Sequence, residues 1–247
     1  MPDTPITTGF PALDKLTGGF LRKQLVTFAG ESASGLSTAL LNIAAHAAID
    51  QKARVLFVDL ESRADVITER LVAAVSGVPL AKIRGSEFTD LDLSHITAAD
   101  EKIRNADLTV TTSLPTVKAI KLRGLDYLPR LIVIDGTRLL DFRDDEKVSE
   151  QLLRLSAKLK RLATSLDTTV CVSQPVARSV GGIGDEDLHP FAVDSDQLIM
   201  VRTYRVFGPN PETEMEVVKN RMGTCGSFPL IPRFECSRFY PADEVAA

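Results

Sequence analysis

Short hydrophobic runs alternate along this chain with longer segments in which apolar residues recur every three or four positions. Compact apolar runs bounded by glycine or polar residues are typical of buried strands, and the longer periodicity is typical of helices. The runs that predict strands lie at 24–30, 53–60, 108–112, 131–134 and 168–173. The helical patterns lie between them, at 37–49, 63–75, 100–105 and 147–166. This order predicts an α/β fold with a mostly parallel central sheet and helices on both of its faces.

The C-terminal part of the chain continues the strand pattern without helices between the runs. Runs at 197–203 and 214–219 predict two more strands, and a hairpin is predicted around 228–239. Residues 241–247 carry no such pattern and predict a flexible tail. Because no repeat or low-complexity linker divides the chain, we predict a single domain over residues 1–247.

The composition is that of a globular protein with a sizeable core, since 44% of the 247 residues are hydrophobic and 25% are charged. The net charge of −4 excludes a surface that is basic all over, so contact with a nucleic acid would need a local channel or several assembled subunits. No apolar run approaches the roughly 18 residues that a membrane-spanning helix needs. No secretion signal precedes the first predicted strand. We therefore expect a cytoplasmic protein with no membrane partner.

A loop of small residues joins the first predicted strand to the first long helix. Glycines in such a loop bend the backbone so that its N–H groups and the helix N-terminus point at one place, which favours an anion such as phosphate. The standard pattern is G-x-x-x-x-G-K-[ST]; the chain matches it at Gly30, Gly35 and Ser37 but carries Leu36 in place of the lysine. An ordinary strand-to-helix turn is the alternative on these residues alone. The predicted phosphate-binding residues are Gly30, Glu31, Ser32, Ala33, Ser34, Gly35, Leu36, Ser37 and Thr38.

Two acidic residues add a second feature of a nucleotide site. Asp135 directly follows the buried run 131–134, as does the aspartate that holds Mg²⁺ beside a phosphate-binding loop. Glu61 follows the second predicted strand and is a candidate to polarise an attacking water. Each also has an ordinary explanation, because apolar strands often end in Asp and a glutamate is common at a solvated helix start. The loop and Asp135 together favour a P-loop nucleotide site more than either does alone.

An ordered series of motifs then runs through almost the whole chain. It opens with Thr8-Gly9-Phe10, Leu13-Asp14 and Gly18-Gly19-Phe20. It continues through 39–44, 58–61, 76–79, 131–135, 155–166, 172–174, 194–196 and 218–223. In this order the motifs resemble the C-terminal, RecA-like motor domain of DnaB-type replicative helicases. The resemblance implies a RecA-like core that assembles as a ring, hexameric in the family, or as a filament, with ATP and Mg²⁺ between subunits. We expect no room within residues 1–7 for the family's N-terminal helical domain.

The resemblance also implies a role for each matching residue. Ser37 would hold Mg²⁺, and Asp135 would hold the same ion through water. Gln174 would sense the γ-phosphate and couple it to the DNA loops. Lys219 and Arg221 resemble the pair that reaches into the neighbouring subunit's nucleotide, although a solvated basic turn explains them locally. The catalytic residues implied in this way are Glu61, Gln174, Lys219 and Arg221.

Departures from the family pattern predict weakened ATP binding and hydrolysis. A lysine about 4 Å from a phosphate, at an effective dielectric of about 20, contributes about 4 kcal/mol before desolvation, so its loss weakens binding by roughly 10²–10³. Leu36 removes this cation, and Glu31 adds a negative charge to the same loop. Lys23 cannot substitute, because it precedes the first strand and is expected at the strand's far end.

The predicted DNA-facing loops are also altered. Arg178 and the backbone N–H groups of Gly181 and Gly182 are the candidates for contact with single-stranded DNA. Three acidic residues follow them at 185–187, and the other candidate loop, 141–147, is net acidic. Since helicase channels need a positive groove, the sequence predicts weak binding to single-stranded DNA.

Three interpretations fit these observations. The first is a DnaB-like motor domain that keeps the fold, with weak ATP binding and hydrolysis. The second is a working ATP-dependent translocase in which a basic residue from elsewhere, such as Lys219 of a neighbour, replaces the missing lysine. The third is a non-catalytic scaffolding or regulatory protein that keeps the helicase fold for protein–protein contacts. Retention of the remaining site residues speaks against the third.

Overall fold

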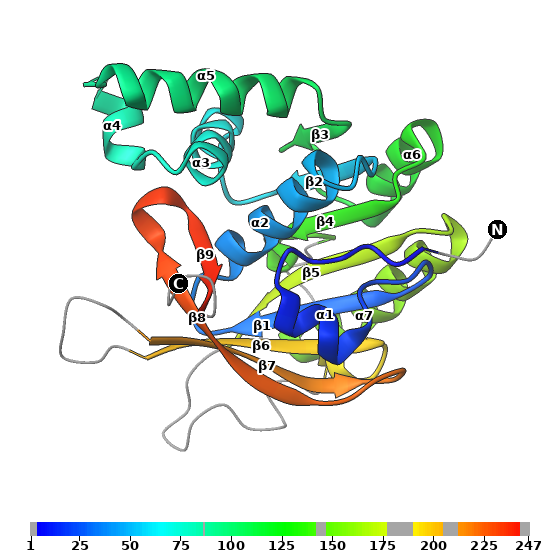
Figure 1. Cartoon of the computed structure of the whole chain (residues 1–247). Helices are drawn as coiled ribbons and strands as arrows, with labels where there is room; N and C mark the ends of the chain where they lie inside the picture. The colour runs from blue at the N-terminus through cyan, green and yellow to red at the C-terminus, as the bar shows by residue number, and fades with distance from the viewer. Residues whose placement is uncertain (1–3, 86, 142–146, 177–189, 205–211, 243–247) are drawn as a thin grey trace.

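The computed structural model describes residues 4–85, 87–141, 147–176, 190–204 and 212–242 (Figure 1). Its centre is a nine-stranded sheet in the order β3-β2-β4-β5-β1-β6-β7-β8-β9. Strands β3, β2, β4, β5, β1 and β6 pair with their neighbours in parallel. Strands β6, β7, β8 and β9 pair with their neighbours antiparallel. The strands are β1 Leu25–Gly30, β2 Val55–Asp59, β3 Leu108–Thr111, β4 Leu131–Asp135, β5 Thr169–Pro175, β6 Gln197–Tyr204, β7 Glu212–Asn220, β8 Gly226–Arg233 and β9 Arg238–Pro241.

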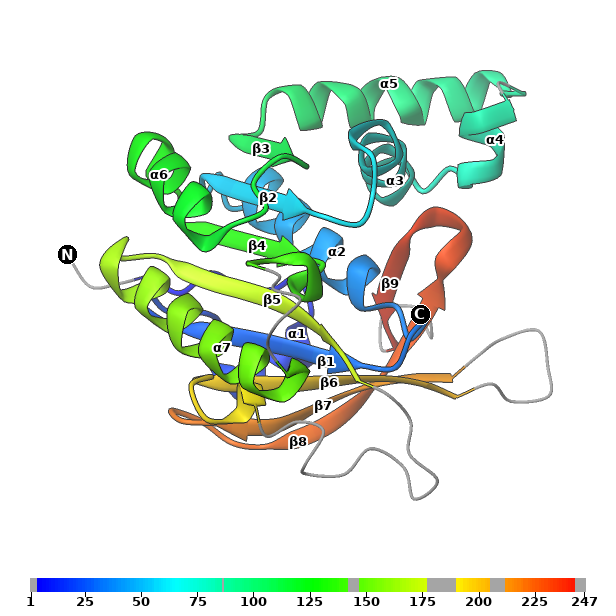
Figure 2. The same cartoon turned by 180° about the vertical axis from the view of Figure 1, so that it is seen from behind.

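Helices cover both faces of the parallel part of the sheet. Helices α1 and α2 lie on one face, and α6 and α7 lie on the other, as the two opposite views show (Figures 1 and 2). The helices are α1 Pro11–Thr17, α2 Leu36–Ile49, α3 Ala64–Ser76, α4 Leu80–Gly85, α5 Asp90–Arg104, α6 Val117–Tyr127 and α7 Val148–Ser165. Two 3₁₀ turns, η1 Thr137–Leu139 and η2 Phe234–Cys236, complete the described elements.

Alternation along the strands divides the core into two layers. Val26 and Phe28 of β1 pack with the layer around α2, whereas Leu25 packs with the layer around α6 and α7. All six residues of β1 and all five of β4 are buried, as expected for parallel strands covered on both faces. The strand-to-helix turn after β1 is therefore attached to a strand that is buried along its whole length.

The predicted α/β fold, mostly parallel sheet and helices on both faces are confirmed. Helices α1, α4 and α6 were not predicted, and α5 begins ten residues before the predicted 100–105 segment. These helices present mostly polar or exposed residues, so their apolar periodicity is weak. The tail prediction was wrong at its start, because Pro241 pairs with Leu230 as the last residue of β9. Residues 243–247 lie outside the described residues.

Helix α7 offers a test of the packing of the second layer. Leu159 is fully buried against the sheet, whereas Leu153 on the same helix is 38% exposed. Replacing Leu159 by Ala leaves a cavity, so Leu159→Ala is expected to lower the free energy of unfolding by about 2–5 kcal/mol. The matched control Leu153→Ala should lower it by about 1 kcal/mol or less. Urea unfolding followed by circular dichroism measures both, and equal losses in the two variants would refute this packing.

Candidate functional site

The loop between β1 and α2 has the backbone geometry of an anion site. Ala33 and Gly35 both have left-handed backbones, with φ of 64° and 95°. A Cβ atom on Gly30 would lie 2.6 Å from the Ser34 Oγ and from a backbone oxygen of β6. A side chain is thus excluded at Gly30, and the chain enters α2 with Gly35 as its N-cap.

This geometry leaves donors in the loop for a ligand. The first-turn N–H groups of a helix have no partner inside the helix, and Gly35 has no side chain that could cap them. The Ser34 Oγ is buried and has no hydrogen-bond partner among the described residues. The backbone therefore fits a phosphate group by the chemistry of its donors.

Leu36 occupies the position of the missing lysine, and its side chain turns into the core. It is 7% exposed and packs with the apolar layer around α2. Its Cγ lies 3.4 Å from the point where a Cβ on Gly30 would stand. The loop therefore keeps its shape without a lysine, but the side chain at position 36 contributes no positive charge.

Carboxylates from neighbouring strands meet beside the loop. Strands β2 and β4 are paired so that Asp59 stands opposite Asp135, and Glu61 follows two residues after Asp59. The Asp59 Oδ1 accepts the backbone N–H of Glu61 at 2.9 Å and thereby fixes the turn that carries Glu61. Burial raises the pKa of Glu61, as do the negative charges of Asp135 and Asp59, while the charge of Arg138 acts in the opposite direction. This role of Asp59 was not predicted from the sequence, because it depends on a hydrogen bond that forms only in the folded turn.

Loop and carboxylates line one pocket of about 710 Å³. Arg70, Arg138 and Phe234 also line it and were not predicted. The predicted residues that line it are Glu31, Ser32, Ala33, Gly35, Leu36, Ser37, Thr38, Glu61 and Asp135. Within the described part of the chain, no three His, Cys, Asp or Glu side chains are placed to hold a metal ion. Ser37 and Asp135 both line the pocket, and Mg²⁺ takes one or two carboxylates and completes its shell with water and phosphate oxygens.

Gln174 lies near the end of β5, between Ser173 and Pro175, which both line the pocket. Its own side chain is 4% exposed and is not part of the lining. The Nε2 group donates to the backbone oxygen of Pro175 at 3.2 Å, and the buried Oε1 atom has no partner among the described residues. Gln174 is thus beside the pocket but not in it.

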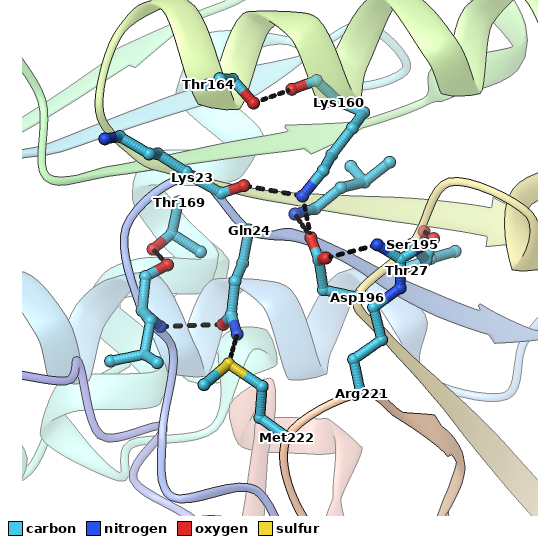
Figure 3. Close-up of polar contacts among 12 residues, drawn as sticks. Lys23, Gln24, Thr27, Lys160, Thr164, Thr169, Ser195, Asp196, Arg221 and Met222 are labelled. Atoms are coloured by element: carbon cyan, nitrogen blue, oxygen red, sulfur yellow. Dashed lines mark hydrogen bonds and ion pairs between the residues drawn. The ribbon is translucent and has the colours of Figure 1, made fainter.

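Lys219 and Arg221 lie at the other end of the sheet. Arg221 follows β7, and its guanidinium pairs with Asp196, which also accepts the backbone N–H of Leu25 at the start of β1 (Figure 3). Lys160 reaches the same carboxylate from α7. Lys219 donates to a backbone oxygen at position 192. Leu25 and the loop are separated by the length of β1, roughly 17 Å, so neither residue can reach the phosphate loop of its own chain.

The remaining predictions concern residues that are not described. Arg178, Gly181 and Gly182 lie outside the described residues, as does most of the predicted 141–147 loop. Among the helices of the described residues, none is long and apolar enough to cross a membrane.

A glycine-bent loop after a central parallel strand, with carboxylates at the ends of the neighbouring strands, defines a P-loop NTPase fold of the RecA-like class. More particularly, the chain belongs to the family of the DnaB-like helicase C terminal domain, whose model matches residues 5–241. The resemblance found in the sequence is therefore confirmed.

Individual relatives agree with this assignment. The replicative DNA helicase DnaB of Treponema pallidum is 27% identical over 252 residues, which cover 95% of this chain and 55% of that protein. The DnaB of Geobacillus stearothermophilus is 26% identical over 256 residues, which cover 96% and 56%. The chain thus spans about half the length of these curated relatives. The solved structure of a DnaB-like replicative helicase matches with a TM-score of 0.86 at 22% identity, covering 96% of this chain and 62% of that one.

The pKa of Glu61 gives a test of the carboxylate cluster. Because the folded state raises this pKa above its ordinary value of 4.5, the stability that Glu61 contributes is present below that value and is lost as pH rises through the folded pKa. Glu61→Gln is neutral at every pH, so it should melt at a higher temperature than the unmodified chain at neutral pH. This difference should vanish near pH ~4.

Thermal unfolding at several pH values measures this difference. The exposed Glu101→Gln on α5 removes a carboxylate outside the pocket and controls for the loss of one negative charge. A Glu61→Gln chain that melts below the unmodified protein at neutral pH would count against the cluster as described.

Proposed function

We propose that the chain, as a single RecA-like domain over residues 1–247, is a DnaB-like ATPase domain acting in DNA replication or DNA metabolism, with weakened ATP binding and hydrolysis. Family membership supports the helicase context, and the pocket beside the loop supports the nucleotide. The observation that carries the weakening is Leu36, which turns into the core where a lysine would contact phosphate. The cytoplasm remains the predicted location.

Different groups in the pocket would bind the phosphates, hold the Mg²⁺ ion and accept a proton. The N–H groups of the loop and the first turn of α2 would bind the phosphates. Ser37 and Asp135 would hold the Mg²⁺ ion, which when bound would neutralise charge on the phosphate oxygens. Glu61 would accept a proton from the attacking water, and its raised pKa suits this role because it makes the carboxylate a stronger base.

Lys219, Arg221 and Gln174 would act in an assembly of several copies of the chain. Lys219 and Arg221 are too far from their own loop, so they would act only on the nucleotide of a neighbouring copy in a ring, hexameric as in the family, or in a filament. Gln174, at the strand end beside the pocket, would respond to the γ-phosphate and pass the change to the segment that follows it. Single-stranded DNA would be a weakly bound partner.

A second candidate function is a non-catalytic scaffold that keeps the helicase fold for protein–protein contacts. The observation that favours it is the apolar Leu36 together with Glu31, whose negative charge opposes a phosphate in the same pocket. Nucleotide binding separates the two functions.

Restoring the lysine is the direct test of the proposed weakness. The unmodified chain is expected to bind Mg·ATP with a Kd weaker than about 100 μM, and Leu36→Lys should gain at least about tenfold, because it returns a cation to the phosphates. Isothermal titration calorimetry measures both constants. The control Leu125→Lys, on the exposed face of α6, adds the same charge away from the pocket and should leave the affinity unchanged.

Two results would point elsewhere. If neither the unmodified chain nor Leu36→Lys binds Mg·ATP, the scaffolding function is favoured. If the unmodified chain binds tightly and turns ATP over, a working translocase replaces the proposal of a weakened ATPase.

Binding to single-stranded DNA should be weak and sensitive to salt. The acidic residues Asp185, Glu186 and Asp187 follow the candidate DNA residues in the sequence and would repel a polyanion. Neutralising all three to Asn, Gln and Asn is expected to strengthen binding. Fluorescence anisotropy with a labelled oligothymidine at about 50 and about 200 mM salt measures the affinity and its salt slope. Nanomolar binding that resists salt would contradict the prediction.

A further inference from the structure

The guanidinium of Arg70 lies in the pocket whose phosphate loop has Leu36 in place of a lysine. Arg70 belongs to α3, where Ile67 and Leu71 are buried against the rest of the protein. Arg70 lies at the margin of this buried face and lines the pocket together with Leu36 and Thr38. The packing of α3 therefore holds the Arg70 side chain beside the pocket.

A hydrogen bond attaches Arg70 to the first turn of α2. The Arg70 Nη2 atom donates to the Thr38 Oγ1 at 3.3 Å, and Thr38 is the third residue of that helix. Free first-turn N–H groups and the helix dipole favour negative charge at this end. The guanidinium thus lies beside the place where the backbone would bind phosphate.

The charge of Arg70 is not neutralised by a described carboxylate. Within the described residues, no Asp or Glu oxygen forms an ion pair with it, and its bond to Thr38 uses one of the five donors of a guanidinium. The neighbouring acids on α3 pair elsewhere, Glu69 with Arg84 and Asp65 with Arg63. Arg70 keeps donors and a full positive charge for an anion.

Two other cations are less suited to the same task. Arg138 also lines the pocket, but it is exposed on η1 and its charge acts on the carboxylate of Glu61. Lys219 lies at the opposite end of the sheet and could act only from a neighbouring copy. Of these three, Arg70 alone contacts the helix turn that follows the loop.

We propose that Arg70 supplies, from α3 of the same chain, the positive charge that the phosphate loop lacks at Leu36, and that it contacts the phosphates of the bound nucleotide. This inference rests on the proposed nucleotide-binding function. It assigns the site a cation that the loop pattern alone does not contain.

A double-substitution cycle tests whether Arg70 replaces the lysine. Mg·ATP affinity is measured by low-affinity calorimetric titration for the unmodified chain, Arg70→Gln, Leu36→Lys and the double variant. Arg70→Gln should weaken binding at least about tenfold in the unmodified chain, but less than about threefold beside Leu36→Lys, where a second cation is present. Arg70→Lys, which keeps the charge, should retain most of the affinity.

Two controls separate charge from structure. Arg63→Gln removes an exposed arginine at the N-cap of the same helix and should leave affinity unchanged. Melting temperatures show whether Arg70→Gln disturbs α3, and recovery of affinity with Arg70→Lys identifies the charge as the cause.

The outcomes distinguish this inference from the proposed function. Binding by the unmodified chain that Arg70→Gln leaves unchanged overturns the role of Arg70 alone, as does an equal loss in both backgrounds. Binding that appears only with Leu36→Lys, or that depends on protein concentration and is lost in Lys219→Gln, also overturns it. If no variant binds Mg·ATP, both the inference and the proposed function fail.

Discussion

Parallel backbone pairing holds β1 between β5 and β6, and this pairing sets the position of the loop around which the pocket is formed. Because β1 is buried along its whole length, its last residue, Gly30, cannot shift without disturbing both layers of the core. The left-handed backbones at Ala33 and Gly35 then return the chain into α2. The donors of the loop are thus fixed by the sheet and the glycines rather than by any charged side chain.

The same constraint explains why the loop keeps its shape without a lysine. A P-loop lysine adds charge to a site that the backbone has already formed. Leu36 instead adds apolar area to the layer around α2, so most of its side chain is buried in the core and the part that lines the pocket carries no charge. The C-terminal hairpin closes the loop from the other side, since a Cβ on Gly35 would lie 2.5 Å from the ring of Phe239. Folding and ligand affinity are therefore separable in this site.

Much of the site follows from local sequence, and the rest depends on tertiary contacts. The strand, the loop and Asp135 are contiguous or directly follow a buried run, so their pattern is visible in the residues. Arg70 and Phe234 reach the pocket from α3 and from η2, and nothing in their own neighbourhoods indicates a ligand. Helix α6 was missed because its outer face exposes leucines that blur the apolar periodicity. The burial of Gln174 beside, rather than in, the pocket likewise needs the structure.

Backbone N–H groups after β1 are proposed to receive the phosphates of a nucleotide. Amide chemical shifts in a ¹⁵N TROSY spectrum, followed during titration with Mg²⁺ and a non-hydrolysable ATP analogue, test it most directly. The largest shifts are expected at Gly35, Leu36 and Ser37, with smaller ones at the neighbouring ends of β2 and β4. Shifts confined to the separate pocket around Thr8 and His46, or no shifts at analogue concentrations well above ~100 μM, would contradict the account.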